Sequence, residues 1–169
     1  SRVNHSCVPN SEFVWNNELQ TQDLRALKKV SEGEEITANY ADVEDGLNKE
    51  YRQSFLLNNF MFECCCVCCA KVGPEADQDE KLRQEMMMLH HQLDNCASAQ
   101  EIVKNINRQL KLSKMIGGVK RQYCLNLLNI GYQTVNSEVD GSHKNWQEVL
   151  LAYATRASKI STLLYGSEF

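Results

Sequence analysis

Five of the eight cysteines fall within six consecutive positions, Cys64-Cys65-Cys66-Val67-Cys68-Cys69. Thiols at Cys-x-Cys and Cys-x-x-Cys spacing are aimed at one point by a short turn of backbone, and four such donors in a tetrahedron hold a structural zinc ion. Cys64, Cys66 and Cys69 supply three donors at these spacings. The cluster therefore predicts a metal site rather than a disulfide framework.

Spacing leaves the fourth metal ligand open, because thiols and imidazoles elsewhere in the chain offer suitable atoms. Within the cluster, Cys65-x-x-Cys68 is a competing pair at metal-binding spacing. Cys96 and Cys124 are expected to be packed thiols on helical faces. The candidates for the fourth ligand are Cys7, Cys96, Cys124, His5, His90, His91 and His143.

The composition is that of an acidic globular chain. Its 169 residues carry 18 Lys and Arg against 22 Asp and Glu, a formal net charge of −4. Domains that neutralise phosphates usually carry a basic surplus, so direct binding of nucleic acid is not expected. A run of about 18 apolar residues would suggest a membrane span, and none approaches this length, so a membrane protein is not expected either. Reduced, clustered thiols indicate a nuclear or cytoplasmic location.

The elements that must position the cluster begin with β structure. The pattern predicts a strand at residues 12–15, a turn at Asn16-Asn17 and a second strand over residues 24–29. A polar turn at residues 31–35 precedes the short run at residues 36–40. We interpret this part as small antiparallel β structure.

Helices are predicted on both sides of the cluster. Apolar spacing changes to the period of about 3.6 residues typical of a helix, which predicts a helix over residues 45–59 that leads into the cysteines. Gly73-Pro74 breaks the chain after them, and connectors are expected at Gly117-Gly118 and at residues 139–142. A helical bundle or the start of a solenoid is predicted from four further amphipathic faces, at residues 82–93, 102–110, 119–130 and 146–164.

Three motifs in fixed order resemble a SET-domain lysine methyltransferase. They are Asn4-His5-Ser6-Cys7-Val8-Pro9-Asn10, then Gly33-Glu34-Glu35-Ile36-Thr37-Ala38-Asn39-Tyr40, then Phe62-Glu63-Cys64-x-Cys66-x-x-Cys69. With a helical region behind them, the chain resembles the SET and MYND domain (SMYD) family. The resemblance covers residues 1–69 with motifs and residues 75–169 only in pattern.

The resemblance implies a role for each motif residue. Cys7 becomes the fourth zinc ligand beside Cys64, Cys66 and Cys69, which leaves Cys65 and Cys68 outside the site. The reaction implied is transfer of a methyl group from S-adenosylmethionine to the ε-amine of a protein lysine, histone or non-histone. Asn4, His5 and Phe62 would contact this cofactor, and Tyr40 would be the catalytic residue that orients the amine.

One position departs from the family pattern. The family commonly has a tyrosine two residues before the phenylalanine that precedes the cysteines, and this chain has Phe60 there. In SET enzymes, exchange of Tyr and Phe in the lysine channel is associated with the number of methyl groups added. Phe60 therefore bears on product multiplicity and on activity itself.

The expected fold class is α+β. The resemblance divides the chain into the C-terminal part of a SET β-fold at residues 1–59, a post-SET zinc segment at residues 60–73 and an all-α, tetratricopeptide-like region at residues 74–169 that offers a surface for protein partners. We expect the chain to be the C-terminal part of a longer methyltransferase and to be inactive alone. The alternatives are a catalytically silent SET-like zinc scaffold for protein–protein interaction and a plain zinc-binding module.

Overall fold

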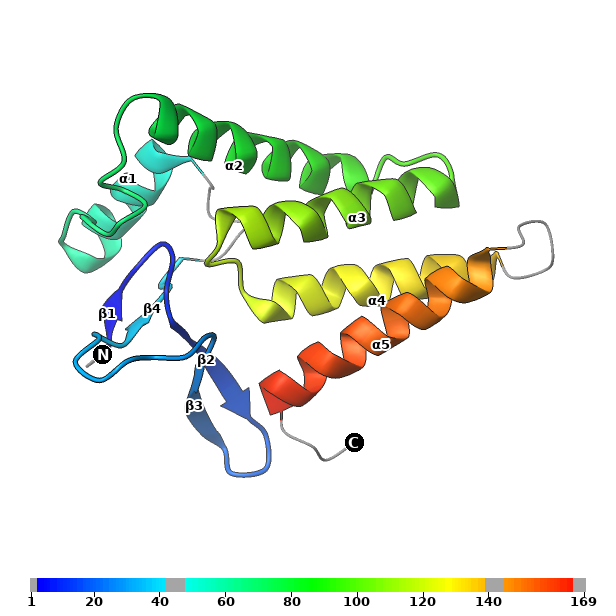
Figure 1. Cartoon of the computed structure of the whole chain (residues 1–169), viewed down its shortest axis with the longest axis horizontal. Helices are drawn as coiled ribbons and strands as arrows, with labels where there is room; N and C mark the ends of the chain where they lie inside the picture. The colour runs from blue at the N-terminus through cyan, green and yellow to red at the C-terminus, as the bar shows by residue number, and fades with distance from the viewer. Residues whose placement is uncertain (1–2, 42–47, 139–144, 166–169) are drawn as a thin grey trace.

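A computed structural model describes residues 3–41, 48–138 and 145–165 of the chain. Figure 1 shows short strands gathered at one end and long helices stacked beside them. The described part is thus a mixed architecture of a small β region and a larger helical region, in agreement with the predicted α+β class.

The predicted hairpin is confirmed. Strands β2 (Ser11–Asn16) and β3 (Thr21–Ala26) pair in antiparallel register, with Phe13 opposite Leu24. The side chain of Asn16 accepts hydrogen bonds from the backbone amides of the next turn residues, which is the reason that Asn favours this position. The second strand ends at Ala26, before the predicted end at residue 29.

A second strand pair differs from the prediction of antiparallel structure. Strand β1 (Asn4–His5) pairs with β4 (Thr37–Ala38) in parallel. The buried side chain of Asn10 holds the two segments together, since it donates to the backbone oxygen of Glu35 at 2.8 Å and accepts from the amide of Thr37 at 2.9 Å. A strand of two residues is too short to show alternation of apolar and polar residues in the sequence. The pairing of β1 with β4 therefore depends on side-chain hydrogen bonds that the sequence pattern does not reveal.

Helix α1 (Lys49–Phe60) leads into the cysteine cluster, as predicted. The side chain of Asn48 caps it by accepting from the amide of Tyr51, and Met61 ends it in a left-handed conformation with φ of 62°. The predicted start near residue 45, including Leu47, lies outside the described residues.

The other four described helices follow the predicted amphipathic faces. Pro74 and Gly117-Gly118 mark helix ends where the sequence predicted breaks, although Val119 precedes the helix to which it was assigned. The predicted connector at residues 139–142 lies outside the described part of the chain. The helices are α2 (Pro74–Leu93), α3 (Ala99–Ile116), α4 (Arg121–Ser137) and α5 (Trp146–Tyr165).

Each of these helices packs on the next, α2 on α3, α3 on α4 and α4 on α5 (Figure 1). The main core lies between α3, α4 and α5 and includes Ile106, Leu128 and Tyr153. Gly131 on α4 allows a close approach of α5, because a Cβ atom there would lie 2.6 Å from the ring of Tyr153.

None of the helices in the described ranges combines the length and apolar character that a membrane span requires.

The link between α3 and α4 joins the helical region to the β region. Gly118, with φ of 71°, lies so close to the backbone of Cys7 that an added Cβ would sit 2.2 Å from its carbonyl oxygen. At the start of α4, Arg121 binds the carboxylate of Glu12 at 3.2 Å and donates to the backbone oxygens of Ala26 and Leu27. The helical region is therefore fixed to the strand that follows Cys7.

Replacing Arg121 by Met is expected to lower the free energy of unfolding by about 3 kcal/mol, because it leaves the buried carboxylate of Glu12 without its cation. Glu12→Gln is the matched control and should cost about 1 kcal/mol or less. Burial raises the pKa of Glu12 against the opposing effect of Arg121, so the contribution of this carboxyl to stability declines as pH rises through that pKa. Gln mimics the protonated form. Urea unfolding measures the free energy of unfolding of both variants, and an equal loss of stability in Arg121→Met and Glu12→Gln would contradict this explanation.

Candidate functional site

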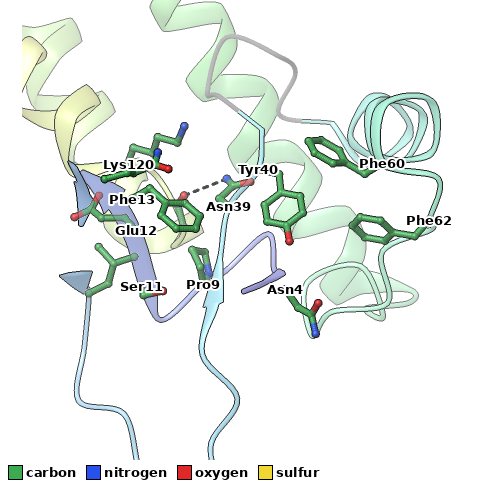
Figure 2. Close-up of a pocket in the computed structure, with 13 residues that line it drawn as sticks. Asn4, Pro9, Ser11, Glu12, Phe13, Asn39, Tyr40, Phe60, Phe62 and Lys120 are labelled. Carbon is green, nitrogen blue, oxygen red and sulfur yellow. Dashed lines mark hydrogen bonds between the residues drawn. The ribbon is translucent and has the colours of Figure 1, made fainter. Parts of the chain in front are cut away.

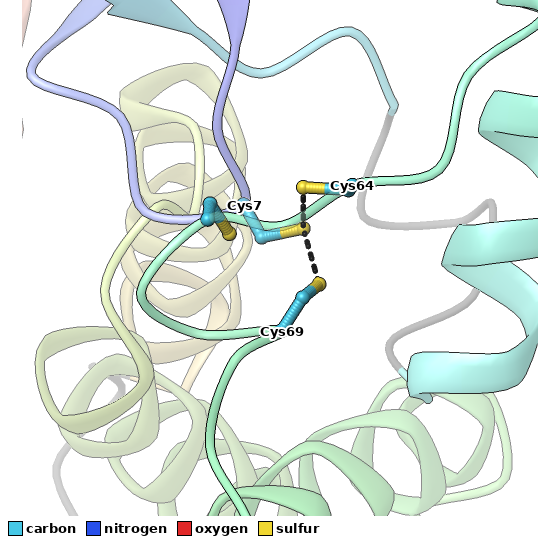
Figure 3. A group of neighbouring side chains, drawn as sticks. Cys7, Cys64 and Cys69 are labelled. Carbon is cyan, nitrogen blue, oxygen red and sulfur yellow. Dashed lines mark hydrogen bonds between the residues drawn. The ribbon is translucent and has the colours of Figure 1, made fainter.

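The structure brings four cysteines together from two distant segments. Cys7 follows β1, and Cys64, Cys66 and Cys69 lie in the loop between α1 and α2. Their four sulfur atoms all lie within 4.8 Å of one another. Figure 3 shows Cys7, Cys64 and Cys69 converging on one point, with sulfur distances of 4.0 Å from Cys7 to Cys64 and 3.6 Å from Cys7 to Cys69.

This donor set fits a tetrahedral metal ion. With a Zn–S bond of about 2.3 Å, the sulfurs of a tetrahedron lie about 3.8 Å apart, between the two distances given for Cys7. All eight cysteines are free of disulfide bonds. Three of the four grouped thiols are buried and Cys66 is half-buried, so four thiolates here would close the coordination shell and leave no position for a substrate water.

Among the other sequence candidates for the fourth ligand, His5 adjoins the sulfur of Cys7, whereas Cys96, Cys124, His90 and His91 lie elsewhere. His90 contacts the hydroxyl of Tyr123, and Cys124 donates to Ser113 within the helical region. Cys96 follows the end of α2 instead of lying on a helical face as predicted. His91 is in the last turn of α2, outside the group of four, and His143 lies outside the described residues.

Crowding of the thiols perturbs their acidity. Hydrogen bonds with Cys64, Cys69 and Cys7 lower the pKa of Cys66, while hydrogen bonds with its neighbours and burial raise that of Cys7. The bond with Cys66 raises the pKa of Cys64, but those with Cys69 and Cys7 outweigh it and lower the value to about 7. Two thiols of the group, Cys66 and Cys64, therefore have lowered pKa values and favour the thiolate that binds a metal, whereas the pKa values of Cys7 and Cys69 are raised.

The pair Cys65 and Cys68 is not part of the group. Cys65 is exposed, whereas the buried thiol of Cys68 turns toward charged side chains of two helices. It accepts from Arg52 of α1 at 3.7 Å and from Arg83 of α2 at 3.1 Å, and it donates to Asp79 at 3.4 Å. Sequence reasoning missed this ionic cluster. Asp79 and Arg83 stand four residues apart on α2, but Arg52 and Cys68 come from other segments and share no motif with them.

His5 connects the cysteines with Tyr40. Its Nδ1 accepts a hydrogen bond from the backbone amide of Tyr40 at 3.1 Å, and its Nε2 lies 3.4 Å from the sulfur of Cys7. Burial lowers the pKa of His5, which favours the neutral ring. We assign its proton to Nε2 from these contacts, so that the imidazole donates toward the sulfur.

Aromatic rings surround Tyr40. Its ring centroid lies 4.8 Å from that of Phe60 and 6.4 Å from that of Phe62, and the latter pair is edge-on. The Tyr40 hydroxyl donates to the backbone oxygen of Val3. Asn4 lies beside this group and donates from its side chain to Glu35 at 2.6 Å. The structure therefore places Asn4, Tyr40 and Phe62 next to one another.

Two cavities meet at these three residues. Figure 2 shows the larger one, of about 920 Å³, with Tyr40, Phe60 and Phe62 on one side and Glu12, Phe13 and Lys120 on the other. The smaller cavity, of about 590 Å³, is lined by His5, Glu34 and the cysteine loop at residues 64–67. Asn4, Tyr40 and Phe62 line both, so they form a shared wall.

The helical region contributes to the larger cavity through Gly118 and Lys120. Asn39 donates to the backbone oxygen of Gly118 at 3.5 Å, and this bond crosses the cavity wall in Figure 2. Sequence reasoning treated Gly117-Gly118 only as a connector. The two adjacent glycines were the one feature of the sequence that could have indicated the close approach of Gly118 to the backbone of Cys7.

The sequence is similar to that of known SET-domain proteins and histone-lysine methyltransferases. Residues 1–41 match the family described as SET domain. The chain is 37% identical over 87 residues to Histone-lysine N-methyltransferase set5 of Schizosaccharomyces pombe, covering 52% of this chain and 27% of that protein. It is 30% identical over 161 residues to Histone-lysine N-methyltransferase Smyd1 of Mus musculus, covering 79% and 32%.

A third relative is Histone-lysine N-methyltransferase SMYD3 of Mus musculus, which is 35% identical over 89 residues, or 51% of this chain and 20% of that protein. The chain thus spans about a fifth to a third of the length of these relatives.

Proposed function

We propose that this chain, a SMYD-like SET protein of the lysine methyltransferase family, forms part of an enzyme that transfers methyl groups from S-adenosylmethionine to protein lysines. One observation carries the proposal. The wall of Asn4, Tyr40 and Phe62 separates two cavities, so a donor on one side and an acceptor on the other can meet at Tyr40. Direct transfer requires that two bound molecules be held close to each other, and two cavities that share lining residues can hold them in this way.

The smaller cavity is the proposed cofactor site. Its volume falls within the range of about 300–1,000 Å³ typical of small-molecule sites. S-adenosylmethionine, when bound, supplies an activated methyl group on a positively charged sulfur. Phe62 offers an aromatic ring, which attracts a cation, and Asn4 offers an amide that can donate or accept. His5 lines the cavity but acts chiefly by fixing the backbone of Tyr40.

The larger cavity is the proposed lysine side. Phe60 and Phe62 can exclude water from an amine, which favours its neutral, nucleophilic form. The Tyr40 phenol then orients the amine. Phe60 stands where a tyrosine is common in the family, and its lack of a hydroxyl removes one polar contact to the amine. The same substitution is the observation that favours the silent scaffold as a second candidate function.

The cysteine group is the proposed structural zinc site. Cys7, Cys64, Cys66 and Cys69 would hold the ion, and it would tie the segment of Asn4 and His5 to the loop that follows Phe62. We further propose that the packing of α2 to α5 is tetratricopeptide-like and offers a surface to protein partners. A nuclear or cytoplasmic setting would keep the thiols reduced.

Cofactor binding tests this assignment. The full-length protein should bind S-adenosylmethionine in a calorimetric titration, and Asn4→Ala should weaken binding about tenfold by removing a polar contact worth about 1.4 kcal/mol. Asn59→Ala is the control, because the side chain of this exposed residue of α1 donates to the backbone oxygen of Phe55 within the same helix. Equal affinities in wild type and Asn4→Ala would remove Asn4 from the cofactor site.

A further inference from the structure

The ionic cluster formed by Cys68 and the charged side chains bonded to it is almost completely buried. Arg52, Cys68, Asp79 and Arg83 are 5%, 4%, 8% and 3% exposed. Arg83 binds Asp79 at 2.6 Å, and the half-buried Lys71 binds the other oxygen of Asp79 at 2.9 Å. Such a cluster needs an explanation, because buried charges are costly unless each is paired with an opposite charge and hydrogen-bonded.

The cluster carries an excess of positive charge. Its cations are Arg52, Arg83 and Lys71, and its carboxylate is Asp79. The sulfur of Cys68 lies between these charges, because it donates to Asp79 and accepts from both arginines. Three cations therefore face one carboxylate, and the two arginines among them are shielded from water while Lys71 is half-buried.

The neighbouring metal site offers the opposite charge. A divalent ion bound by four thiolates carries a net charge of −2. Both arginines donate to the sulfur of Cys68, which is the chain neighbour of the proposed ligand Cys69, so their guanidinium groups lie against the ligand loop. A filled tetrathiolate centre is therefore opposite in sign to the excess charge of the ionic cluster.

We infer that Arg52 and Arg83 are positioning residues that balance the charge of the metal centre, and that filling the centre holds α2 against the cysteine loop. The inference rests on the zinc site proposed above. It assigns to the two arginines a part in metal affinity that no motif indicates.

The burial of α2 supports the second half of this inference. The fully buried residues of this helix are Asp79, Arg83 and Met86. Two of the three are charged and face the cysteine loop, so the N-terminal half of the helix docks largely through ions. Without a negative centre nearby, this docking would leave positive charge unbalanced in the interior.

Metal affinity tests the role of the arginines. Zinc is titrated from the loaded protein with a chromophoric chelator, and circular dichroism checks the fold. Arg83→Met should weaken zinc binding at least about tenfold, as outer-shell changes typically do. Arg83→Lys keeps the charge and should stay within about threefold if charge is what matters. Arg108→Met is the matched control, because this arginine forms an ion pair with Glu85 on the surface and contacts none of the four grouped cysteines among its side-chain bonds.

Three outcomes would overturn the inference. One is unchanged affinity in Arg83→Met, and another is an equal loss in Arg83→Lys and Arg83→Met, which would point to shape rather than charge. The third concerns hydrogen exchange in the wild-type protein with and without zinc. Removal of zinc should lower the protection of the amides of residues 77–86 more than that of the amides of α5. Equal losses of protection in the two segments would contradict metal-linked docking of α2. A wild type that binds no zinc would instead overturn the proposed metal site.

Discussion

Replacing Cys7 by Ser is expected to weaken zinc binding by more than about 100-fold, the upper range for changes to residues that only support a metal site. The reason is the donor set, because a serine hydroxyl is a harder and far less acidic ligand than a thiol. Zinc content after dialysis against a chelator, measured by atomic emission, reports the loss. The chain should also become less stable, because metal-binding energy is folding energy in such sites.

Cys65→Ser is the matched control for this prediction. Cys65 lies between two of the proposed ligands but is exposed and outside the group of four. The same substitution there should leave zinc content within about twofold of wild type, because it removes no ligand. If Cys65→Ser loses the metal and Cys7→Ser keeps it, the assigned ligand set is wrong.

Replacing Tyr40 by Phe is expected to reduce the rate of methyl transfer by about 10²–10³-fold, the usual cost of losing one hydrogen-bonding group aimed at the reacting atoms. Affinity for S-adenosylmethionine should change little, since the ring and its contacts with Phe60 and Phe62 remain. Single-turnover rates and calorimetric titration of the full-length protein separate the two effects.

Tyr51→Phe controls for the chemical change in Tyr40→Phe. Tyr51 is an exposed residue of α1, and its loss of a hydroxyl should leave the rate within about twofold. A Tyr40→Phe enzyme that transfers methyl groups at the wild-type rate would show that the phenol takes no part in the reaction.

Much of the local structure could be predicted from the sequence. Alternation and the Asn16-Asn17 turn predicted the β2–β3 hairpin, and the breaks at Gly73-Pro74 and Gly117-Gly118 predicted helix ends. These predictions are correct because each depends on residues close together in the chain. Spacing within the cluster likewise indicated Cys64, Cys66 and Cys69, which the structure places in one group.

What could not be predicted depends on contacts between distant segments. Spacing alone did not select Cys7, which lies 57 residues before Cys64, and the resemblance to SET proteins supplied that assignment. The parallel pairing of β1 and β4 depends on the buried amide of Asn10. In the Arg52–Asp79–Arg83 cluster only the four-residue spacing of Asp79 and Arg83 is readable from the sequence, and such a pair on a helix is usually at the surface.

The most direct test of the account is transfer of labelled methyl from S-adenosylmethionine to proteins of a hypomethylated cell extract by the full-length, zinc-loaded protein. The account predicts labelled lysine in the hydrolysed products, and mass spectrometry of the labelled band would identify the site and the number of methyl groups. Absence of labelled lysine, from a folded protein that holds its zinc, would contradict the assignment as a methyltransferase and favour a SET-like zinc scaffold.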